Sequence, residues 1–360
     1  MGKLVLVTGV TGYIGSHVCK NYIEAGDKVR GTVRDKSKKS AHLAKWIENG
    51  DLELFEIDLL SESAKWKQAC AGVEFVAHVA SPFFIGCPPS EAEEKLYKPA
   101  RQGTENVLQG ALDAGTVKRV VVTSSIAAVT AGHEPTPFLE KPEEQWSIIE
   151  KAEPYSASKT MAERAAWAFV EQAKKDGKPV FELATVNPSL VIGPPLGSNW
   201  ATSHAIPKRM LNREMPALPD ISYPTIDVRD VALAHRLATE KPDAAGKRFI
   251  LQEHSTSFQE WSMELASEFK KFGYNPPTRH LPYFVLWIYA RFDETTRGIL
   301  PQVGRVKENL DCTLAKNVLG MEFRGWKESV VDHAHGCLQQ NIKGFVQTEA
   351  YKAYLAESQK

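Results

Sequence analysis

The first 190 residues of this chain alternate between short apolar runs and longer amphipathic ones, and this alternation restricts the fold more than any other feature. Apolar and β-branched residues fill runs that predict strands at 3–8, 29–33, 52–57, 75–78, 119–123 and 181–186. Helical patterns lie between them at 13–25, 102–114 and 156–176. Strands and helices that alternate over this length predict a parallel, doubly wound α/β sheet. The nearly continuous apolar character of the strands fits a sheet that is covered on both faces.

The alternation ends after Asn187, where prolines interrupt a loop-rich stretch, and the last third of the chain is mostly helical. Ser257, with Glu260 three residues later, has the spacing of a capping box and predicts a helix over 258–272. We therefore expect a nucleotide-binding domain followed by a smaller, mostly helical domain that binds the substrate. The expected bounds are 1–190 for the first, with a return of the chain around 225–251, and 191–224 together with 252–360 for the second.

A glycine triplet, Gly9, Gly12 and Gly15, separates the first predicted strand from the first predicted helix. Glycines at such a turn let the chain bend sharply, let the backbone approach a pyrophosphate, and let the helix pack close to the sheet. The N-terminus of the helix would direct N–H groups and a partial positive charge at the phosphates. The spacing is G-x-x-G-x-x-G rather than G-x-G-x-x-G, and a glycine-rich turn without a ligand is the alternative. Its place between a strand and a helix favours a dinucleotide site.

The residue that recognises the cofactor's ribose is expected about 20 residues past the glycine loop. Arg34 stands at this place, after the second predicted strand. An acidic residue there would favour NAD, whereas an arginine suits the 2′-phosphate of NADP. Lys38 could add a second cation, while Asp35 could pair with Arg34 or bind the ribose itself. We predict NADP(H); the alternative is that Arg34 and Lys38 are ordinary surface charges.

Three residues have the chemistry of a carbonyl reductase. Tyr155 and Lys159 are spaced i and i+4, which places them on one face of a helix, and Ser125 follows a strand whose carboxyl end should meet the ligand. Ser125 would hydrogen-bond a substrate carbonyl oxygen, Tyr155 would give that oxygen a proton, and Lys159 would stabilise the tyrosinate and bind ribose hydroxyls. Function near neutral pH predicts a Tyr155 pKa below the value of about 10 of a free tyrosine, lowered by the nearby ammonium together with a cationic nicotinamide ring. A packing tyrosine beside a surface lysine is the alternative.

The motifs T-G-x-x-G-x-x-G, H-V-A-S-P, T-S-S, Y-x-x-x-K and N-P-S-L-V-I-G-P follow one another along the chain. In this order the chain resembles the extended short-chain dehydrogenases/reductases, and it is most similar to the dihydroflavonol reductase branch and the related yeast methylglyoxal (carbonyl) reductases. The resemblance implies a Rossmann domain, NADP(H) and the triad Ser125, Tyr155 and Lys159. The cofactor contacts that it implies are Gly9, Thr11, Gly12, Tyr13, Ile14 and Gly15 in the loop, Arg34 and Lys38 at the ribose, Asp58 and Leu59 at the adenine, Val79, Ala80, Ser81 and Thr123 beside the cofactor, and Pro188 and Ser189 on the nicotinamide side.

Two positions depart from the family's pattern. Many relatives carry an Asn on the helix before the G-T-x-N-V segment, where this chain has Ala100, so a relay through that Asn is not expected. Plant flavonoid enzymes tend to carry an Asn downstream of the catalytic Ser, where this chain has Thr130. We therefore do not expect flavonoid specificity.

The substrate pocket is expected to be mainly apolar, with a few polar groups. Its predicted lining is Phe83, Phe84, Val129, Thr130, Leu190 and Trp200. Such a lining favours hydrophobic or aryl ketones and aldehydes over charged sugars, although Phe83 and Phe84 could instead be core residues. Three other classes of protein stay open. One is an NAD-dependent sugar-nucleotide epimerase or dehydratase, against which Arg34 argues, and another is a non-catalytic dinucleotide sensor, which would usually lack the Tyr or the Lys of the triad. The third is a steroid dehydrogenase/isomerase, for which no membrane anchor is recognised.

Composition bounds the partners and the compartment. Lys and Arg together number 44, as do Asp and Glu, so the basic excess that predicts nucleic-acid binding is missing. The five cysteines have no C-x-x-C spacing, which indicates reduced thiols, and His333 and His335 form an isolated H-A-H, so no metal is expected. No signal peptide is recognised, and the longest apolar stretch, 281–290, is about half a membrane span. We expect a cytoplasmic monomer or homodimer that acts on a small carbonyl compound, with no nucleic-acid or membrane partner.

Overall fold

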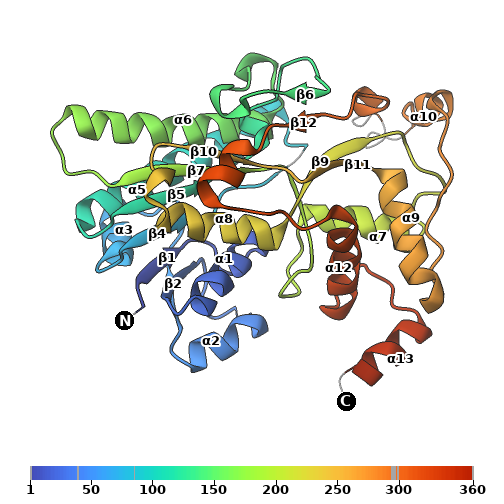
Figure 1. Ribbon diagram of the computed structural model, residues 1–360, viewed down its shortest axis with the longest axis horizontal. Helices are drawn as coiled ribbons and strands as arrows, with labels where there is room; N and C mark the ends of the chain where they lie inside the picture. Colours follow the sequence, from blue (N-terminus) through green and yellow to red (C-terminus); the bar gives the residue numbers. More distant parts are fainter. Residues whose placement is uncertain (1, 39, 85, 293–296, 298–299, 359–360) are drawn as a thin grey trace.

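The computed structural model describes residues 2–38, 40–84, 86–292, 297 and 300–358. Within them, seven parallel strands form one sheet in the order β10-β7-β5-β4-β1-β2-β3 (Figure 1). The strands are β1 (Leu4–Val7), β2 (Lys28–Val33), β3 (Leu52–Glu56), β4 (Phe75–His78), β5 (Arg119–Thr123), β7 (Glu182–Pro188) and β10 (Arg248–Leu251). The order reverses between β1 and β4, where ligands of such sheets bind. The predicted parallel, doubly wound α/β sheet is therefore confirmed.

Helices cover both faces of this sheet, which explains why its strands are apolar along their whole length. One face carries α3 (Ser63–Cys70), α5 (Lys98–Ala114) and α6 (Pro154–Lys175), and the other carries α1 (Tyr13–Glu24) and α8 (Val228–Glu240). Trp66 and Leu108 are buried against the first face, and Tyr22 is buried on the second. The carboxyl ends of the parallel strands lie along one edge of the sheet, between the two helical layers. The candidate site is at this edge.

The remaining elements form a second body of structure beside the sheet. A small sheet of β8 (Leu190–Ile192), β9 (Ser222–Asp227) and β11 (His254–Ser257) packs with α7 (Ala205–Leu211), α9 (Phe258–Phe269), α10 (Tyr283–Tyr289), α12 (Trp326–Gln339) and α13 (Glu349–Ser358) on the right of Figure 1. The predicted capping box is confirmed, because the Ser257 hydroxyl accepts the Glu260 N–H and the Glu260 carboxylate accepts the Ser257 N–H. The bounds of the two domains stay a prediction.

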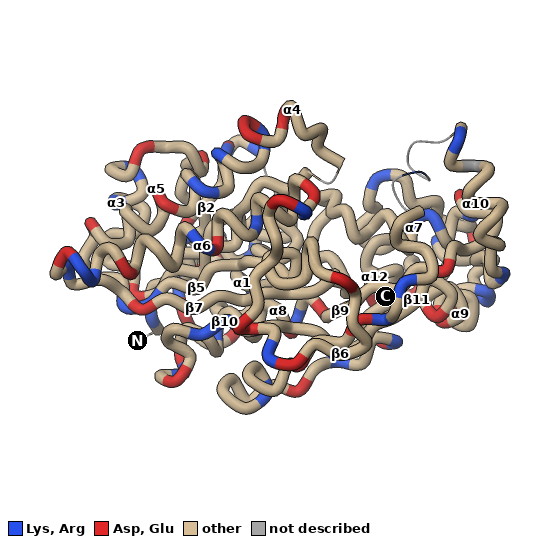
Figure 2. The backbone as a smooth tube through the Cα atoms, turned by 90° about the horizontal axis from the view of Figure 1, so that it is seen from above, with Lys and Arg blue, Asp and Glu red and all other residues tan. Residues whose placement is uncertain are grey.

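Short elements complete the chain. They are α2 (Ala44–Glu48), α4 (Pro89–Ala92), and the two-residue strands β6 (Phe138–Leu139) and β12 (Asn309–Leu310), which pair with each other. Figure 2 shows basic and acidic residues interspersed over both halves of the molecule, in keeping with the zero net charge. Among the described residues, no helix combines the length and the apolar character that crossing a membrane would need.

Candidate active site

The glycine loop joins β1 to α1 at the carboxyl edge of the large sheet. Gly9 has a φ of 70°, a left-handed conformation that glycine adopts without steric cost. A Cβ atom on Gly15 would lie 2.2 Å from the carbonyl oxygen of Gly9, so only glycine lets the first turn of α1 pack against the loop. Gly12 is the N-cap of α1, and no capping side chain or acidic residue serves the first turn. The N–H groups of this turn suit an anion such as the predicted pyrophosphate.

Three other residues of the loop have side chains or carbonyls that are used within the protein. The Tyr13 hydroxyl donates to the carbonyl of Gly193 (2.6 Å), and the Ile14 side chain packs into the core between α1 and α8. The carbonyl of Thr11 accepts a hydrogen bond from the Asn199 amide (2.7 Å). If Tyr13 and Ile14 bind a cofactor, we therefore expect them to do so through their main-chain N–H groups rather than through their side chains.

The end of β4 lies against the glycine loop. The Thr8 hydroxyl, at the end of β1, accepts hydrogen bonds from the N–H groups of Val79 and Ala80, each at 2.9 Å. A Cβ atom on Gly9 would lie 3.1 Å from the Cβ of Ala80, which shows how closely the two segments approach. The predicted cofactor residues Val79, Ala80 and Ser81 are thus next to the glycine loop in space.

The expected adenine residues lie after β3, which is the neighbour of β2 in the sheet. The Asp58 carboxylate accepts a hydrogen bond from its own turn, from the N–H of Leu60 (2.9 Å). The carbonyl of Leu59 accepts one from the Asn106 amide (3.1 Å), which fixes this loop on α5. Asp58 and Leu59 therefore lie on the same side of the site as the end of β2.

Arg34 is exposed at the end of β2, and it has no ion-pair partner in the described part of the chain. Asp35 is engaged in its own turn: its carboxylate accepts hydrogen bonds from the Ser37 N–H (2.9 Å) and hydroxyl (2.6 Å) and lies 3.9 Å from the Lys38 ammonium. The Ser37 hydrogen bonds lower the pKa of Asp35. Asp35 therefore does not form an ion pair with Arg34, and the Arg34 guanidinium can bind a ligand.

Ser125 and Tyr155 are each held at the start of a helical turn. Ser125 follows β5 and caps a short 3-10 turn, because its hydroxyl accepts the N–H of Ala127 (3.1 Å). Tyr155 is in the first turn of α6, where the Glu153 carboxylate caps the helix and accepts the Tyr155 N–H (2.9 Å). These two caps hold the backbone of Ser125 and of Tyr155 in place at the carboxyl edge of the sheet.

The structure brings the three predicted catalytic side chains together. The Ser125 hydroxyl lies close enough to Tyr155 to lower the pKa of the Tyr155 hydroxyl, and the Lys159 ammonium lies 6.0 Å from the centroid of the Tyr155 ring. Lys159 is buried, one turn beyond Tyr155 on the same face of α6. A surface lysine, the alternative weighed above, is therefore excluded.

The pKa values of this group differ from the sequence-based expectation. Burial raises the pKa of Tyr155, and the hydrogen bond from Ser125 only partly offsets this, so the expected downshift is wrong for this structure. Burial also lowers the pKa of Lys159 to about 8, against the opposing effect of the Glu163 carboxylate. A raised pKa keeps Tyr155 protonated near neutral pH, which suits a proton donor.

The other residues expected near the nicotinamide are used in different ways. The Thr123 hydroxyl lies 2.6 Å from the His235 ring nitrogen on α8, so it is occupied within the core. The carbonyl of Pro188 is 3.5 Å from the Ser125 hydroxyl, and the Ser189 N–H donates to the carbonyl of Leu251 (2.9 Å). Pro188 thus lies beside the triad, while the Thr123 hydroxyl is engaged with α8.

The predicted substrate residues separate into three groups. Phe83 is half exposed, and its ring stands edge-on to that of Tyr155, with 4.7 Å between the centroids. Phe84 lies under the Lys95 ammonium (5.6 Å) instead. Val129 is completely buried in a cluster with Ile250, which corrects its expected place in the pocket lining, since a fully packed side chain has no surface for a substrate.

The remaining three residues lie at partly open positions. The Thr130 hydroxyl donates to the carbonyl of Ile126 (3.3 Å), within its own turn. Leu190 packs against the core of the second body. Trp200 is half exposed and stands edge-on to His204, with 6.0 Å between the rings.

A buried polar cluster behind the triad was missed from the sequence. Glu163 of α6 pairs with Arg248 of β10 (2.6 Å) and accepts a hydrogen bond from the Asn187 amide (2.8 Å). The signal for Glu163 was present, since it follows Lys159 by four residues and so lies on the same face of α6. Nothing local in the sequence connects it with Asn187 or Arg248.

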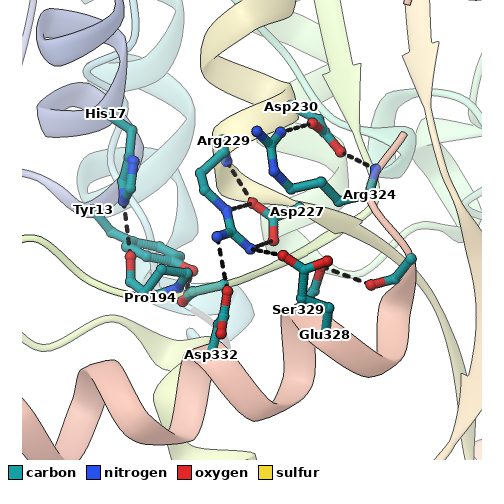
Figure 3. A network of polar contacts seen from close by, with 12 residues as sticks. Tyr13, His17, Pro194, Asp227, Arg229, Asp230, Arg324, Glu328, Ser329 and Asp332 are labelled. Atoms are coloured by element: carbon teal, nitrogen blue, oxygen red, sulfur yellow. Dashed lines mark hydrogen bonds and ion pairs between the residues drawn. The ribbon is translucent and has the colours of Figure 1, made fainter. Parts of the chain in front are cut away.

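Figure 3 shows a polar network between α1, α8 and α12 near the glycine loop. Arg229 of α8 binds the carboxylates of Asp227 (2.7 Å) and, on α12, Asp332 (2.8 Å). His17 of α1 hydrogen-bonds to the carbonyl of Pro194 (2.8 Å). These contacts fix the segment after β8 against α1 and tie the second body to the sheet.

The two histidines of the H-A-H segment have different partners. His333 lies 2.7 Å from His204, with Cys337 nearby in the same buried cluster. This is the separation of a hydrogen bond, whereas two nitrogen ligands of a tetrahedral zinc ion are about 3.3 Å apart, from Zn–N bonds of roughly 2.0 Å. His335 instead lies 3.1 Å from Glu268. The histidine pair is thus explained as a packing contact between hydrogen-bonded rings.

Comparisons with known proteins show which family this chain belongs to and which structures share its fold. Residues 5–251 match the model of the NAD dependent epimerase/dehydratase family. A putative uncharacterized oxidoreductase of Saccharomyces cerevisiae is 31% identical over 94% of this chain and 99% of its own length, and cinnamoyl-CoA reductase CAD2 of Medicago truncatula is 37% identical over 70% and 77%. The crystal structure of Gre2 from Candida albicans in complex with NADPH is similar with a TM-score of 0.76 and 27% identity, covering 94% of this chain and 99% of that protein.

Proposed function

Because this chain belongs to the NAD-dependent epimerase/dehydratase family, we propose that it is an NADPH-dependent oxidoreductase that reduces ketones and aldehydes to alcohols. The observation that carries the proposal is the meeting of Ser125, Tyr155 and Lys159 beside the glycine loop. Its similarity to one protein named as an oxidoreductase and another named as a reductase supports the same reaction class, and its similarity to a structure that holds NADPH supports the cofactor.

The residues at the sheet edge fit NADP(H). The uncapped first turn of α1 provides N–H groups for the pyrophosphate, and Gly12 adds no side chain to the space in front of them. Arg34 is exposed at the end of β2, and its fork of donors suits a 2′-phosphate. Because Asp35 is engaged in its own turn, the free cation here argues for NADPH over NADH, and also against an NAD-dependent epimerase.

The protein's own groups divide the chemistry between them. When bound, NADPH supplies the hydride that reaches the carbonyl carbon. Ser125 holds the carbonyl oxygen with its hydroxyl, and Tyr155 transfers its hydroxyl proton to that oxygen, so that an alcohol forms. Lys159 stabilises the tyrosinate that remains and binds ribose hydroxyls. Tyr155 carries its proton before the reaction, because its pKa is raised above that of a free tyrosine.

We propose hydrophobic or aryl carbonyl compounds as the substrates. The half-exposed ring of Phe83 faces Tyr155 and offers an apolar wall next to the proton donor. A panel of aryl, branched aliphatic and small carbonyl compounds, followed by the loss of NADPH absorbance, tests this proposal. NADPH consumption with aryl ketones or aldehydes is expected; no consumption with any carbonyl compound would overturn it.

Phe83→Ala should lower kcat/KM for an aryl ketone by about 10-fold or more and change that for a small aldehyde much less. An apolar contact of this size is worth roughly 1–3 kcal/mol when only the larger substrate makes it. The matched control is Phe84→Ala, because the neighbouring ring lies under Lys95 and away from Tyr155. An equal effect of both substitutions on the two substrates would place Phe83 outside the pocket.

A further inference from the structure

The carboxylate of Glu163 is the centre of the buried polar cluster behind the triad. Its side chain is fully buried, and one oxygen accepts hydrogen bonds from the Ser124 hydroxyl (2.5 Å) and the Asn187 amide (2.8 Å). The other oxygen accepts a hydrogen bond from the Arg248 guanidinium (2.6 Å) and lies 3.1 Å from the Thr185 hydroxyl. A buried carboxylate with this many donors is held in a single position.

Asn187 connects this carboxylate to the backbone of Ser125. The same amide nitrogen that donates to Glu163 also lies 3.3 Å from the carbonyl oxygen of Ser125. The Asn187 carbonyl oxygen accepts a hydrogen bond from Thr185 (2.8 Å), which fixes how the amide is oriented. The position of Ser125 at the end of β5 therefore depends on a chain of contacts that begins at Glu163.

Glu163 also faces Lys159. The two side chains line a small cavity of about 10 Å³, the volume of about one water molecule, with Ser124 and Thr104. The other titratable group that lines it is His78 of β4, whose pKa is lowered to about 3 by burial and by the charge of Lys159, so it is neutral near pH 7. Tyr155, on the same helix, is protonated there as well, which leaves Glu163 as the negative charge that faces the ammonium.

The competing explanation is that Glu163 is retained only to pair with Arg248. Arg248 also donates to the carbonyls of Glu143 (3.0 Å) and Gln145 (2.7 Å), so the pair orders the loop after the Ser125 turn. A second pair on the same sheet also joins a buried arginine to a glutamate, although this glutamate is exposed: Arg119 binds Glu182 and donates to the carbonyl of Ala238 (2.9 Å). That second pair has no contact with the triad among the hydrogen bonds of the described residues, and it therefore provides a control for the loss of an arginine–carboxylate pair away from the site.

We propose that Glu163 is a positioning residue of the active site, which holds Ser125 in place through Asn187 and supplies the negative charge that faces the Lys159 ammonium. The inference rests on the proposed function, because it takes Ser125 and Lys159 as members of the catalytic group. One face of α6 would then carry three roles: Tyr155 donates the proton, Lys159 supplies the ammonium, and Glu163 positions the other catalytic groups.

The first test uses NADPH affinity, which needs no carbonyl substrate. NADPH fluorescence gives the dissociation constant from about pH 6 to about pH 10, a range that spans the pKa of Lys159. In the native protein the affinity should fall as Lys159 loses its proton, near its pKa of about 8. In Glu163→Gln the fall should move to lower pH by about one unit, because the neighbouring negative charge that favours the ammonium is gone.

Glu163→Gln leaves the Arg248 charge buried without its partner, so this variant could fail to fold. The double variant E163Q/R248M removes both charges and should show the same shift, and Glu163→Asp, which keeps the charge, should retain the native midpoint. Glu182→Gln, in the control pair, should also keep it. A double variant with the native midpoint would overturn the inference, since Glu163 would then act only through Arg248. A native protein without any fall would overturn the assignment of Lys159 in the proposed function, and the role of Glu163 with it.

The second test separates the Asn187 connection from the charge. Asn187→Ala should lower kcat by about 10-fold or more, because small displacements of a catalytic group are costly, while the pH midpoint of NADPH affinity stays native. Melting curves followed by circular dichroism check that the variant is folded. An unchanged kcat in a folded Asn187→Ala variant would overturn the role of Asn187 in holding Ser125.

Discussion

Tyr155→Phe is expected to fold and bind NADPH normally and to lose carbonyl reduction by about 100-fold or more in kcat, the range that a general acid contributes. The substitution removes only the hydroxyl that would protonate the carbonyl oxygen, while the edge-on packing against Phe83 is kept. Because burial holds the pKa of Tyr155 above its usual value, the native hydroxyl carries its proton throughout the neutral range. The measurement is kcat with saturating NADPH, beside the dissociation constant of NADPH.

The control for this substitution is Tyr274→Phe, which removes a buried hydroxyl from the second body, where it donates to the carbonyl of Val346 (2.9 Å). It should leave kcat unchanged. Ser125→Ala should cost less than Tyr155→Phe, since it removes a hydrogen bond to the oxygen but not the proton. Retention of more than about a tenth of the native kcat in Tyr155→Phe would mean that another group is the acid.

Arg34→Ala is expected to raise the KM for NADPH by about 10–100-fold and to change the KM for NADH little. A hydrogen bond between charged groups is worth roughly 1.5–3 kcal/mol, and a guanidinium can make two of them to a phosphate. The site is exposed, so the effect should shrink at high ionic strength. Steady-state kinetics with both cofactors at two salt concentrations measures all of these changes.

Lys38→Ala should raise the KM for NADPH less than Arg34→Ala does. Its side chain is strongly exposed and lies 3.9 Å from Asp35, so it should contribute less to the phosphate than Arg34 does. The turn of Asp35 toward Ser37 is the structural reason to expect NADPH, since an inward carboxylate would repel the 2′-phosphate. A native enzyme with higher kcat/KM for NADH would contradict the role of Arg34.

Local patterns in the sequence were sufficient for most of the sheet. β4 and β5 have the bounds that their apolar runs predict, because strands covered on both faces are apolar from end to end. The helix after Ser257 begins where its capping box predicts, and α1 begins at Tyr13 as predicted, although it has no capping side chain. α5 begins at Lys98 rather than 102, because its first turn is continuous with the helical turns before it and contains Pro99, which a first turn tolerates.

The residues of the candidate site were predictable only where a functional motif has a fixed spacing along the sequence. The i, i+4 spacing places Lys159 beside Tyr155, and the strand–turn–helix pattern places Gly9 and Gly15. The burial of Val129 could not be predicted, since the residues that cover its side chain are far along the chain. The direction of the Tyr155 pKa shift was missed for the same reason, because burial is a property of the folded protein.

The most direct test of the account is hydride transfer from NADPH that carries deuterium at both C4 positions of the nicotinamide. With an aryl ketone or aldehyde, mass spectrometry should find a product alcohol heavier by one deuterium, located on the former carbonyl carbon, with one NADPH consumed per alcohol. NADH labelled in the same way should react more slowly at equal concentration, because it lacks the 2′-phosphate that Arg34 is placed to bind. Product without deuterium, or turnover of a sugar nucleotide without net consumption of the cofactor, would contradict the assignment of a carbonyl reductase.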